Sequence, residues 1–311
     1  MPELDVTALA TQLGAFHRTK KKEIMQKMYA QEDGRKHFKV VSGIKDQYVM
    51  TEMMVSEMIQ PSQKGWQPKG AVSFVPEIIQ NKKVKIDFQF DPSDLEPTWL
   101  GEMKTNGSSI EEFPFVQYIY EYITKRAIRD VNNCVINGVF VAPTAGIPGP
   151  ALTSFNGLLK VYSNAVTAGK IVPTSTGALN AANIVSKVES VFDGVHADFR
   201  EQELVLVMSP THLRNYFRLK RGSDFQNDLG LAANTTLDFT NCKIVAPQYM
   251  NNSNRLIITL RENLLQLEDG VHEEEKLVIQ QDKRDLVVLG NFKRGIGFGI
   301  TTGYVWGNEQ A

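Results

Sequence analysis

The sequence contains few of the features that mark secreted, disulfide-built or membrane-spanning proteins. Only two of its 311 residues are cysteines, Cys134 and Cys242, and neither lies in a CxxC or other metal-type spacing. We therefore expect two buried free thiols rather than a disulfide framework, which is typical of a protein made in the cytosol. Eighteen apolar residues never run together, and residues 1–6 lack the apolar segment of a secretory signal. The sequence thus predicts neither signal-dependent export nor a membrane span.

An excess of charge of one sign is also missing. Lysine and arginine number 34, aspartate and glutamate number 35, and the formal net charge is −1. A chain with this balance has no global field that attracts nucleic acid or anionic membrane. Any DNA near the protein is therefore expected to lie there without being held by net charge. The hydrophobic content of 42% is enough for a sizeable core in one large or two ordinary domains.

Motifs for catalysis, cofactor binding or metal binding are absent as well. Ser209 precedes Pro210 and does not lie in GxSxG, and the glycine run at 295–299 has the wrong spacing for GxGxxG. We interpret that run as a strand interior with close backbone approach, and the acidic residues 273–275 as a solvated turn. No HExxH motif links the scattered histidines, which are His17, His37, His196, His212 and His272. We expect no catalytic residue, no metal ligand and no cofactor.

A long amphipathic helix is the clearest element that the sequence does contain. Its apolar residues recur every three or four positions, which places them on one helical face. A helix over residues 115–136 would be about 33 Å long at 1.5 Å per residue. Pro114 precedes its first turn, and Asn137-Gly138 predicts its end. The residues of the apolar face are Val116, Ile119, Tyr120, Ile123, Ala127, Val131 and Val135.

Residues 1–60 are interpreted as a helical, methionine-rich segment. Methionine adapts to irregular surfaces, so this segment can pack on its own core or against a partner. Next, residues 71–79 and 84–90 predict two strands, with residues 80–83 as the turn of a long β-hairpin. Two strands alone are marginally stable in water, so we expect the hairpin to lie on something else, which favours an intersubunit contact if the hairpin protrudes. The apolar face expected to make this intersubunit contact consists of Val84, Ile86, Phe88 and Phe90.

The second half of the chain alternates between helices and strands. Residues 138–178 are rich in Gly, Pro, Ser and Thr and predict a loop with a short strand near 158–162. A helix follows, capped by Asn180 or Asn183, and then a strand over 203–208. Ser209-Pro210 predicts the start of another helix. The remaining residues predict strands at 242–246, 255–260, 277–281, 286–289 and 295–306.

The order of these segments resembles the Hong Kong 97 fold of tailed-phage major capsid proteins. The resemblance is carried by the helix ending at Asn137-Gly138, by Phe155-Asn-Gly-Leu-Leu-Lys at 155–160, by the strand and Ser209-Pro210, and by residues 242–247. It implies an α+β fold with an N-terminal arm, an extended β-hairpin loop, a peripheral domain built on the long "spine" helix, and an axial domain. In domain terms it implies the arm at 1–60, the extended loop at 61–100, the peripheral domain at 101–202, the axial domain at 203–270, and strands that return to the peripheral domain at 271–311.

The function implied by the resemblance is that of a major capsid protein. Such a chain assembles with its copies through pentamers and hexamers into an icosahedral shell around a phage genome. Expected partners are further copies, separate scaffolding, portal and decoration proteins, and packaged double-stranded DNA bound without sequence specificity. The protein would be found in the virion and would assemble in the cytoplasm of the host bacterium.

Two alternatives stay open at this point. An encapsulin-like compartment has the same architecture but packages an enzyme cargo instead of a genome. A small-molecule-binding α/β enzyme would need a site in the 138–178 loop, formed by convergent polar groups with shifted pKa values.

Overall fold

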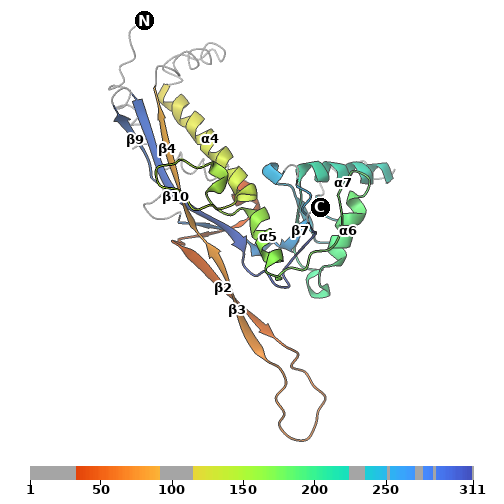
Figure 1. Cartoon of the computed structure of the whole chain (residues 1–311). Helices are drawn as coiled ribbons and strands as arrows, with labels where there is room; N and C mark the ends of the chain where they lie inside the picture. Colours follow the sequence, from red (N-terminus) through yellow and green to blue (C-terminus); the bar gives the residue numbers. More distant parts are fainter. Residues whose placement is uncertain are drawn as a thin grey trace. The chain divides into compact units, whose positions relative to one another are not determined.

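The structure is a computed structural model that describes residues 33–91, 115–223, 235–250, 253–269, 276–282 and 285–309. The chain divides into two compact units (Figure 1). Unit 1 consists of residues 1–45, 81–158 and 266–295, and unit 2 of residues 46–80, 159–265 and 296–311. The predictions for residues 1–32, for the acidic residues 273–275 and for His17 and His272 lie outside the described residues.

Unit 1 contains the predicted spine helix and a sheet. The helix, α4, spans Phe115–Asn137 and buries Ile128, Val131 and Val135. Figure 1 shows it running along the sheet, whose strand order is β1-β8-β10-β4, with β9 also paired to β10. The bounds of the strands and of a short helix are α2 Asp33–His37, β1 Lys39–Ser42, β4 Lys82–Phe90, β8 Leu264–Glu268, β9 Lys276–Asp282 and β10 Asp285–Phe298. The spine helix is therefore confirmed, and β1 replaces the helix expected at 39–42.

The predicted hairpin is wrong in its pairing. Strand β3 (Val72–Gln80) pairs with β2 (Gln47–Val55), whereas β4 pairs with β10. Only Asn81 separates β3 from β4, so residues 80–83 form no turn. The buried Asn81 side chain donates to the Ile44 carbonyl at 2.5 Å, which fixes the junction in place. Alternation identified the strands at 72–80 and 82–90 but not their partners, because period two carries no information on pairing.

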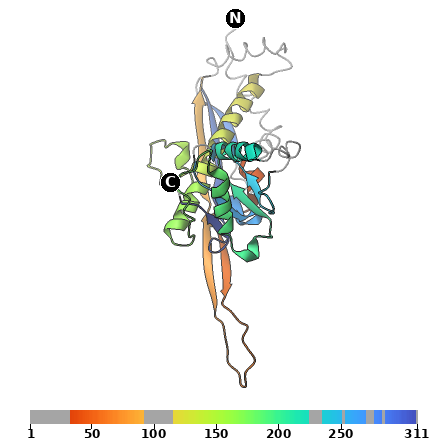
Figure 2. The same ribbon diagram turned by 90° about the vertical axis from the view of Figure 1, so that its right-hand side faces the viewer.

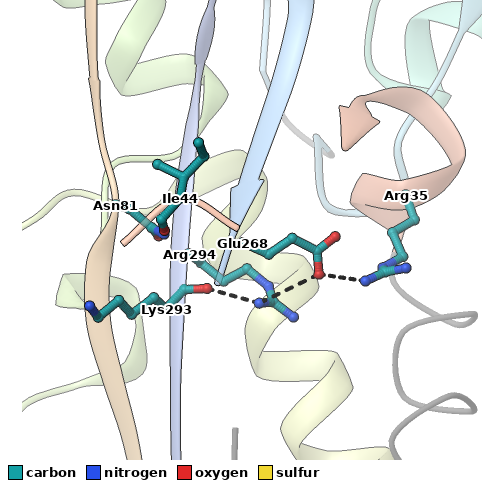
Figure 3. Close-up of polar contacts among 6 residues, drawn as sticks. All are labelled: Arg35, Ile44, Asn81, Glu268, Lys293 and Arg294. Atoms are coloured by element: carbon teal, nitrogen blue, oxygen red, sulfur yellow. Dashed lines mark hydrogen bonds and ion pairs between the residues drawn. The ribbon is translucent and has the colours of Figure 1, made fainter. Parts of the chain in front are cut away.

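Glu268, at the end of β8, anchors the segment formed by α2 and β1 (Figure 3). Its side chain is fully buried and forms an ion pair with Arg35, while Arg294 Nη1 lies 3.9 Å from the same carboxylate oxygen. Its backbone carbonyl accepts a hydrogen bond from Ile44 N at 3.2 Å. One residue thus holds both ends of the α2–β1 segment. A buried carboxylate of this kind is retained only with cations beside it, because an uncompensated buried charge is costly.

The end of α4 and the segment 155–157 lie in close backbone contact. Gly138 N donates to the Cys134 carbonyl and Gly157 N donates to the Gly138 carbonyl, each at 2.9 Å. Asn156 Oδ1 accepts from Phe140 N at 2.8 Å, and the Phe155 side chain is buried. A Cβ on Gly138 would lie 2.3 Å from the Phe155 carbonyl oxygen, and one on Gly157 would lie 2.4 Å from the Cys134 carbonyl oxygen. Only glycine fits at both positions.

Unit 2 is built on a four-stranded sheet of order β11-β7-β5-β6, with β5 parallel to β6 and antiparallel to β7. Helices α6 and α7 pack on a core that includes Val188, Leu206 and Tyr216. Ser209 Oγ accepts from His212 N at 3.2 Å, so the predicted cap of α7 is confirmed. The bounds are α5 Leu158–Thr167, α6 Ile184–Asp193, β5 Leu204–Val207, α7 Pro210–Ser223, β6 Lys243–Val245, β7 Ile257–Leu260 and β11 Val305–Gly307, with short 3-10 helices at Ala197–Phe199, Gln248–Met250 and Arg261–Asn263. The 3-10 helix Ala151–Thr153 lies in unit 1.

Helix α5 corrects the strand predicted near 158–162. Leu158, Tyr162 and Ala165 are buried, and their spacing of four and three is that of one helical face. The Gly- and Pro-rich surroundings suggested a loop, and the run of five residues was too short to show the helical period. Asn183 precedes α6 as predicted, although its side chain accepts from Asn180 N and not from the helix.

The β2–β3 pair, which we call the ribbon, packs one of its faces inside unit 2. Ile79 is buried on this face, and a Cβ on Gly297 would lie 2.7 Å from its side chain. The interpretation of the 295–299 glycines as sites of close approach is therefore confirmed at Gly297. Beyond Ile79 the same face carries two buried glutamates, Glu52 and Glu77. Lys170 Nζ donates to Glu77 Oε2 at 2.8 Å.

The two glutamates of the packed face are electrostatically unequal. Glu77 has the lysine partner, whereas Glu52 Oε2 is buried without a hydrogen-bond partner among the described residues. Burial, together with the charge of Glu77, raises the pKa of Glu52 above its ordinary value of 4.5. Ionised Glu52 therefore opposes the packing of the ribbon on its own unit.

We predict that G138A and G157A each lower the free energy of unfolding by about 2 to 3 kcal/mol, because the added methyl group meets rigid backbone atoms. The measurement is urea denaturation. G149A is the matched control, since its Cβ would meet only the Thr153 hydroxyl at 3.3 Å, and we expect a change within about 0.5 kcal/mol. Equal effects of all three variants would contradict the close-contact interpretation.

We predict that E52Q stabilises the protein at pH 8 and not at pH 4. A raised pKa in the folded state means that ionisation costs stability, and this cost appears only as the pH rises above 4.5 and through the raised pKa. Thermal denaturation of parent and variant across this range measures the difference. E201Q, at an exposed position, should stay within about 0.5 kcal/mol of the parent throughout. A constant E52Q effect at all pH values would argue against ionisation as its cause.

Candidate assembly surfaces

The second face of the ribbon is apolar and exposed. Residues directly opposite each other in an antiparallel pair lie on the same face, and the register joins Val49 to Ile78 and Met53 to Phe74. Val49 is 48% exposed, Met53 59%, Phe74 65% and Ile78 55%. Val72, at 54%, extends the same face toward the end of the ribbon. We call these five residues the apolar stripe.

A loop of residues 56–71 joins the two strands and also exposes apolar side chains. Figure 1 and Figure 2 both show the ribbon and this loop extending away from the rest of unit 2. Local bonds fix the loop: Lys69 Nζ donates to the Ile59 carbonyl at 2.8 Å and pairs with Glu57 at 2.9 Å. Ile59 and Trp66 are 85% and 88% exposed. An ordered loop therefore presents large apolar side chains to solvent.

The residues predicted to make the intersubunit contact lie on β4 in unit 1. Their cross-strand partners on β10 include Leu286 opposite Phe90 and Val288 opposite Phe88, and both partners are buried. Val84, Ile86 and Phe90 are half-buried and Phe88 is 43% exposed. The rings of Phe88 and Phe90 stack with centroids 5.5 Å apart. The four side chains thus share one face, mostly turned toward their own unit, and their contact with a neighbour stays a prediction.

A third exposed apolar group lies in the loop after α4. Val139, Val141 and Ile147 are 44%, 57% and 66% exposed. The loop is held in place by Val139 N donating to the Leu152 carbonyl at 2.8 Å and by Val141 N donating to the Thr153 carbonyl at 3.1 Å. It lies within the 138–178 segment where an enzyme site was considered, but its exposed side chains are aliphatic.

The metal-site, thiol and membrane-span expectations can be compared with the described ranges. Within these ranges no group of three or more His, Cys, Asp or Glu residues could hold a metal ion. Cys134 and Cys242 are buried free thiols as predicted, and burial raises the pKa of each to about 12. No helix among the described residues is long and apolar enough to span a membrane.

Sequence reasoning missed the apolar stripe. It placed the apolar face of the predicted hairpin on β4, whereas the structure exposes Val49, Met53, Phe74 and Ile78 on the ribbon. The methionine-rich segment around Met50 and Met53 was a partial signal, because methionine can pack on its own core or against a partner.

Comparison with known proteins gives structural matches alone. No protein-family model matches the chain, and no curated protein sequence does either. A chain from the procapsid of satellite phage P4, which includes the size determination protein, is 16% identical, with 93% of this chain and 90% of that chain covered and a TM-score of 0.61.

Two further phage structures give similar values. A chain from the capsid of Myoviridae phage XM1 is 10% identical, with 88% of this chain and 90% of that chain covered and a TM-score of 0.54. A chain from Microbacterium phage Oxtober96 is also 10% identical, with 89% and 90% covered and a TM-score of 0.54. At such low identity these likenesses show the fold. The chain has the α+β, Hong Kong 97-like fold of tailed-phage capsid chains.

Proposed function

We propose that this chain is the major capsid protein of a tailed phage and that its copies assemble into an icosahedral shell. The observation that carries the proposal is the apolar stripe. Its five residues are 48–65% exposed, although the opposite face of the same two strands is packed. Burying one such side chain is worth about 1.5 to 3 kcal/mol. The isolated chain forgoes this stabilisation, and a shell in which the ribbon lies on a neighbouring copy recovers it.

The fold supports the same role. The chain is similar over about nine-tenths of its length to chains from a phage procapsid and a phage capsid. The apolar stripe, the 56–71 loop and the loop after α4 expose large apolar side chains, and such surfaces suit a structural role better than a catalytic one. We propose a homo-oligomeric shell whose domains follow the division implied by the resemblance, with the extended loop revised to residues 46–80.

The further partners are part of the proposal. Scaffolding, portal and decoration proteins would be separate chains, and double-stranded DNA would fill the shell without sequence-specific contacts. A formal net charge of −1 fits such a lining, because it supplies no strong field toward the genome. Assembly would take place in the cytoplasm of the bacterial host and yield a component of the virion.

Electron microscopy of the full chain, expressed alone and fractionated by size, tests the proposal. Closed shells, or rings of five and six subunits, are the expected result. A chain that stays monomeric at every concentration would contradict the proposal. Shells isolated from the natural source should contain DNA, and shells that enclose a second protein instead would favour a cargo compartment.

We predict that the double variant M53D/F74D keeps the fold and fails to assemble. The two side chains lie directly opposite each other and are exposed, so the repulsion between the two aspartates costs at most about 1 kcal/mol in the monomer. Burying the same charges in an interface costs much more. We expect the concentration needed for assembly to rise at least about tenfold, the equivalent of 1.4 kcal/mol. Sedimentation velocity measures assembly, and circular dichroism checks the fold.

Two single variants complete this experiment. V172D introduces one aspartate at an 88% exposed residue outside the stripe, and it should assemble like the parent. F88D tests the face originally predicted on β4. Loss of assembly in F88D together with normal assembly of M53D/F74D would move the intersubunit contact from the ribbon to β4.

A further inference from the structure

A short hairpin of unit 2, residues 235–244, holds Phe239 at its tip. The Phe239 side chain is 108% exposed, so its ring contacts almost nothing of its own chain. Among the described residues it is also the only non-glycine residue with a positive φ, at 56°. The two unusual properties coincide on one aromatic residue.

The hairpin is rigid at its base. Leu237 N donates to the Cys242 carbonyl at 2.8 Å, and Ile244 N donates to the Thr235 carbonyl at 2.6 Å. The side chains of Leu237, Cys242 and Ile244 are all buried in the core of unit 2. Because both strands of the hairpin are rooted in this core, the position of the tip is determined by the fold.

The tip itself is a tight turn closed by two bonds to one carbonyl. Thr240 N and Thr240 Oγ1 donate to the Leu237 carbonyl at 3.2 Å and 2.8 Å. Phe239 is the third residue of this turn, where a positive φ favours glycine or asparagine. A bulky side chain is strained there, and such strain persists where the surroundings impose it and where function benefits from it. In the isolated chain the Phe239 ring brings no compensating contact.

The charges around the tip favour a protein partner of apolar character. The turn carries one charged side chain, Asp238, which is ion-paired with Lys220. The neighbouring Asn241 uses its Nδ2 to donate to the Glu201 carbonyl at 2.9 Å. A nucleic acid would be held through basic side chains that neutralise phosphates. Here an aromatic ring stands on a turn whose one charge is already neutralised, which is the composition of an interface anchor.

We propose that Phe239 is an assembly anchor that packs against an apolar surface of a second copy of this chain. The inference rests on the proposed shell function, in which a copy of the same chain is the partner present at every contact. It adds a contact independent of the ribbon, made by one residue of the 235–244 hairpin. The strained φ of Phe239 then keeps the ring exposed for contact, and burial of the ring against the neighbouring copy offsets the free-energy cost of that strain.

This account predicts opposite effects of one substitution on folding and on assembly. F239G relieves the strained φ and removes the ring, so we expect a melting temperature equal to or above that of the parent. The same variant should need at least a tenfold higher concentration to assemble, measured by light scattering and sedimentation velocity on the full chain. F239Y keeps the aromatic ring and should assemble within a factor of two of the parent. A residue with a merely structural role would lose stability and assembly together.

Burial of the ring can be followed directly. In F239W, the difference fluorescence spectrum against the parent should shift to shorter wavelength when particles form. Parent-like assembly of F239G, or a tryptophan signal at position 239 that stays solvent-like in assembled particles, would overturn the anchor and leave the shell function intact. A parent chain that forms no oligomer at any concentration would overturn both proposals, and this outcome is seen before any variant is made.

Discussion

A two-stranded ribbon can bury only one of its faces within its own chain, and this constraint shapes how the protein stabilises itself. The packed face of β2–β3 is held by Ile79 against Gly297 and by the ion pair between Glu77 and Lys170. The opposite face carries the apolar stripe, whose five side chains are exposed. Such a ribbon is marginal alone. In the proposed shell, a neighbouring copy would cover this face.

Elsewhere in the chain, specific contacts fix the position of the backbone. In unit 1, Glu268 fixes both ends of the α2–β1 segment, and Gly138 and Gly157 allow backbone approaches that a methyl group would prevent. In unit 2 the apolar core fixes the root of the 235–244 hairpin. Because these supports are rigid, exposed elements can keep strained conformations that a flexible loop would relax, such as the positive φ of Phe239.

Local patterns predicted the elements better than their partners. The 3.6-residue period identified α4, and the side chain and ring of Ser209-Pro210 predicted the start of α7, because both signals lie within one turn of helix. The motif at 155–157 was noticed by resemblance, and the structure explains it through a buried ring, a capping amide and a close glycine. The pairing of β3 with β2 depends on contacts distant in sequence, and short α5 shows too few turns for its period to appear.

The site was harder to predict for a related reason. In sequence, an apolar strand face that awaits a neighbouring subunit is identical to one that faces its own core, so Val84 to Phe90 and Val72 to Ile78 were indistinguishable. The structure distinguishes the two sets. The first set lies opposite residues of β10 that include the buried Leu286 and Val288, whereas the apolar stripe residues of the second set are exposed to solvent. No sequence pattern indicated Phe239, because residue type does not determine the φ angle. If the function is association, as proposed, the informative residues are those whose exposure or strain is unfavourable in the monomer, and only the folded chain identifies them.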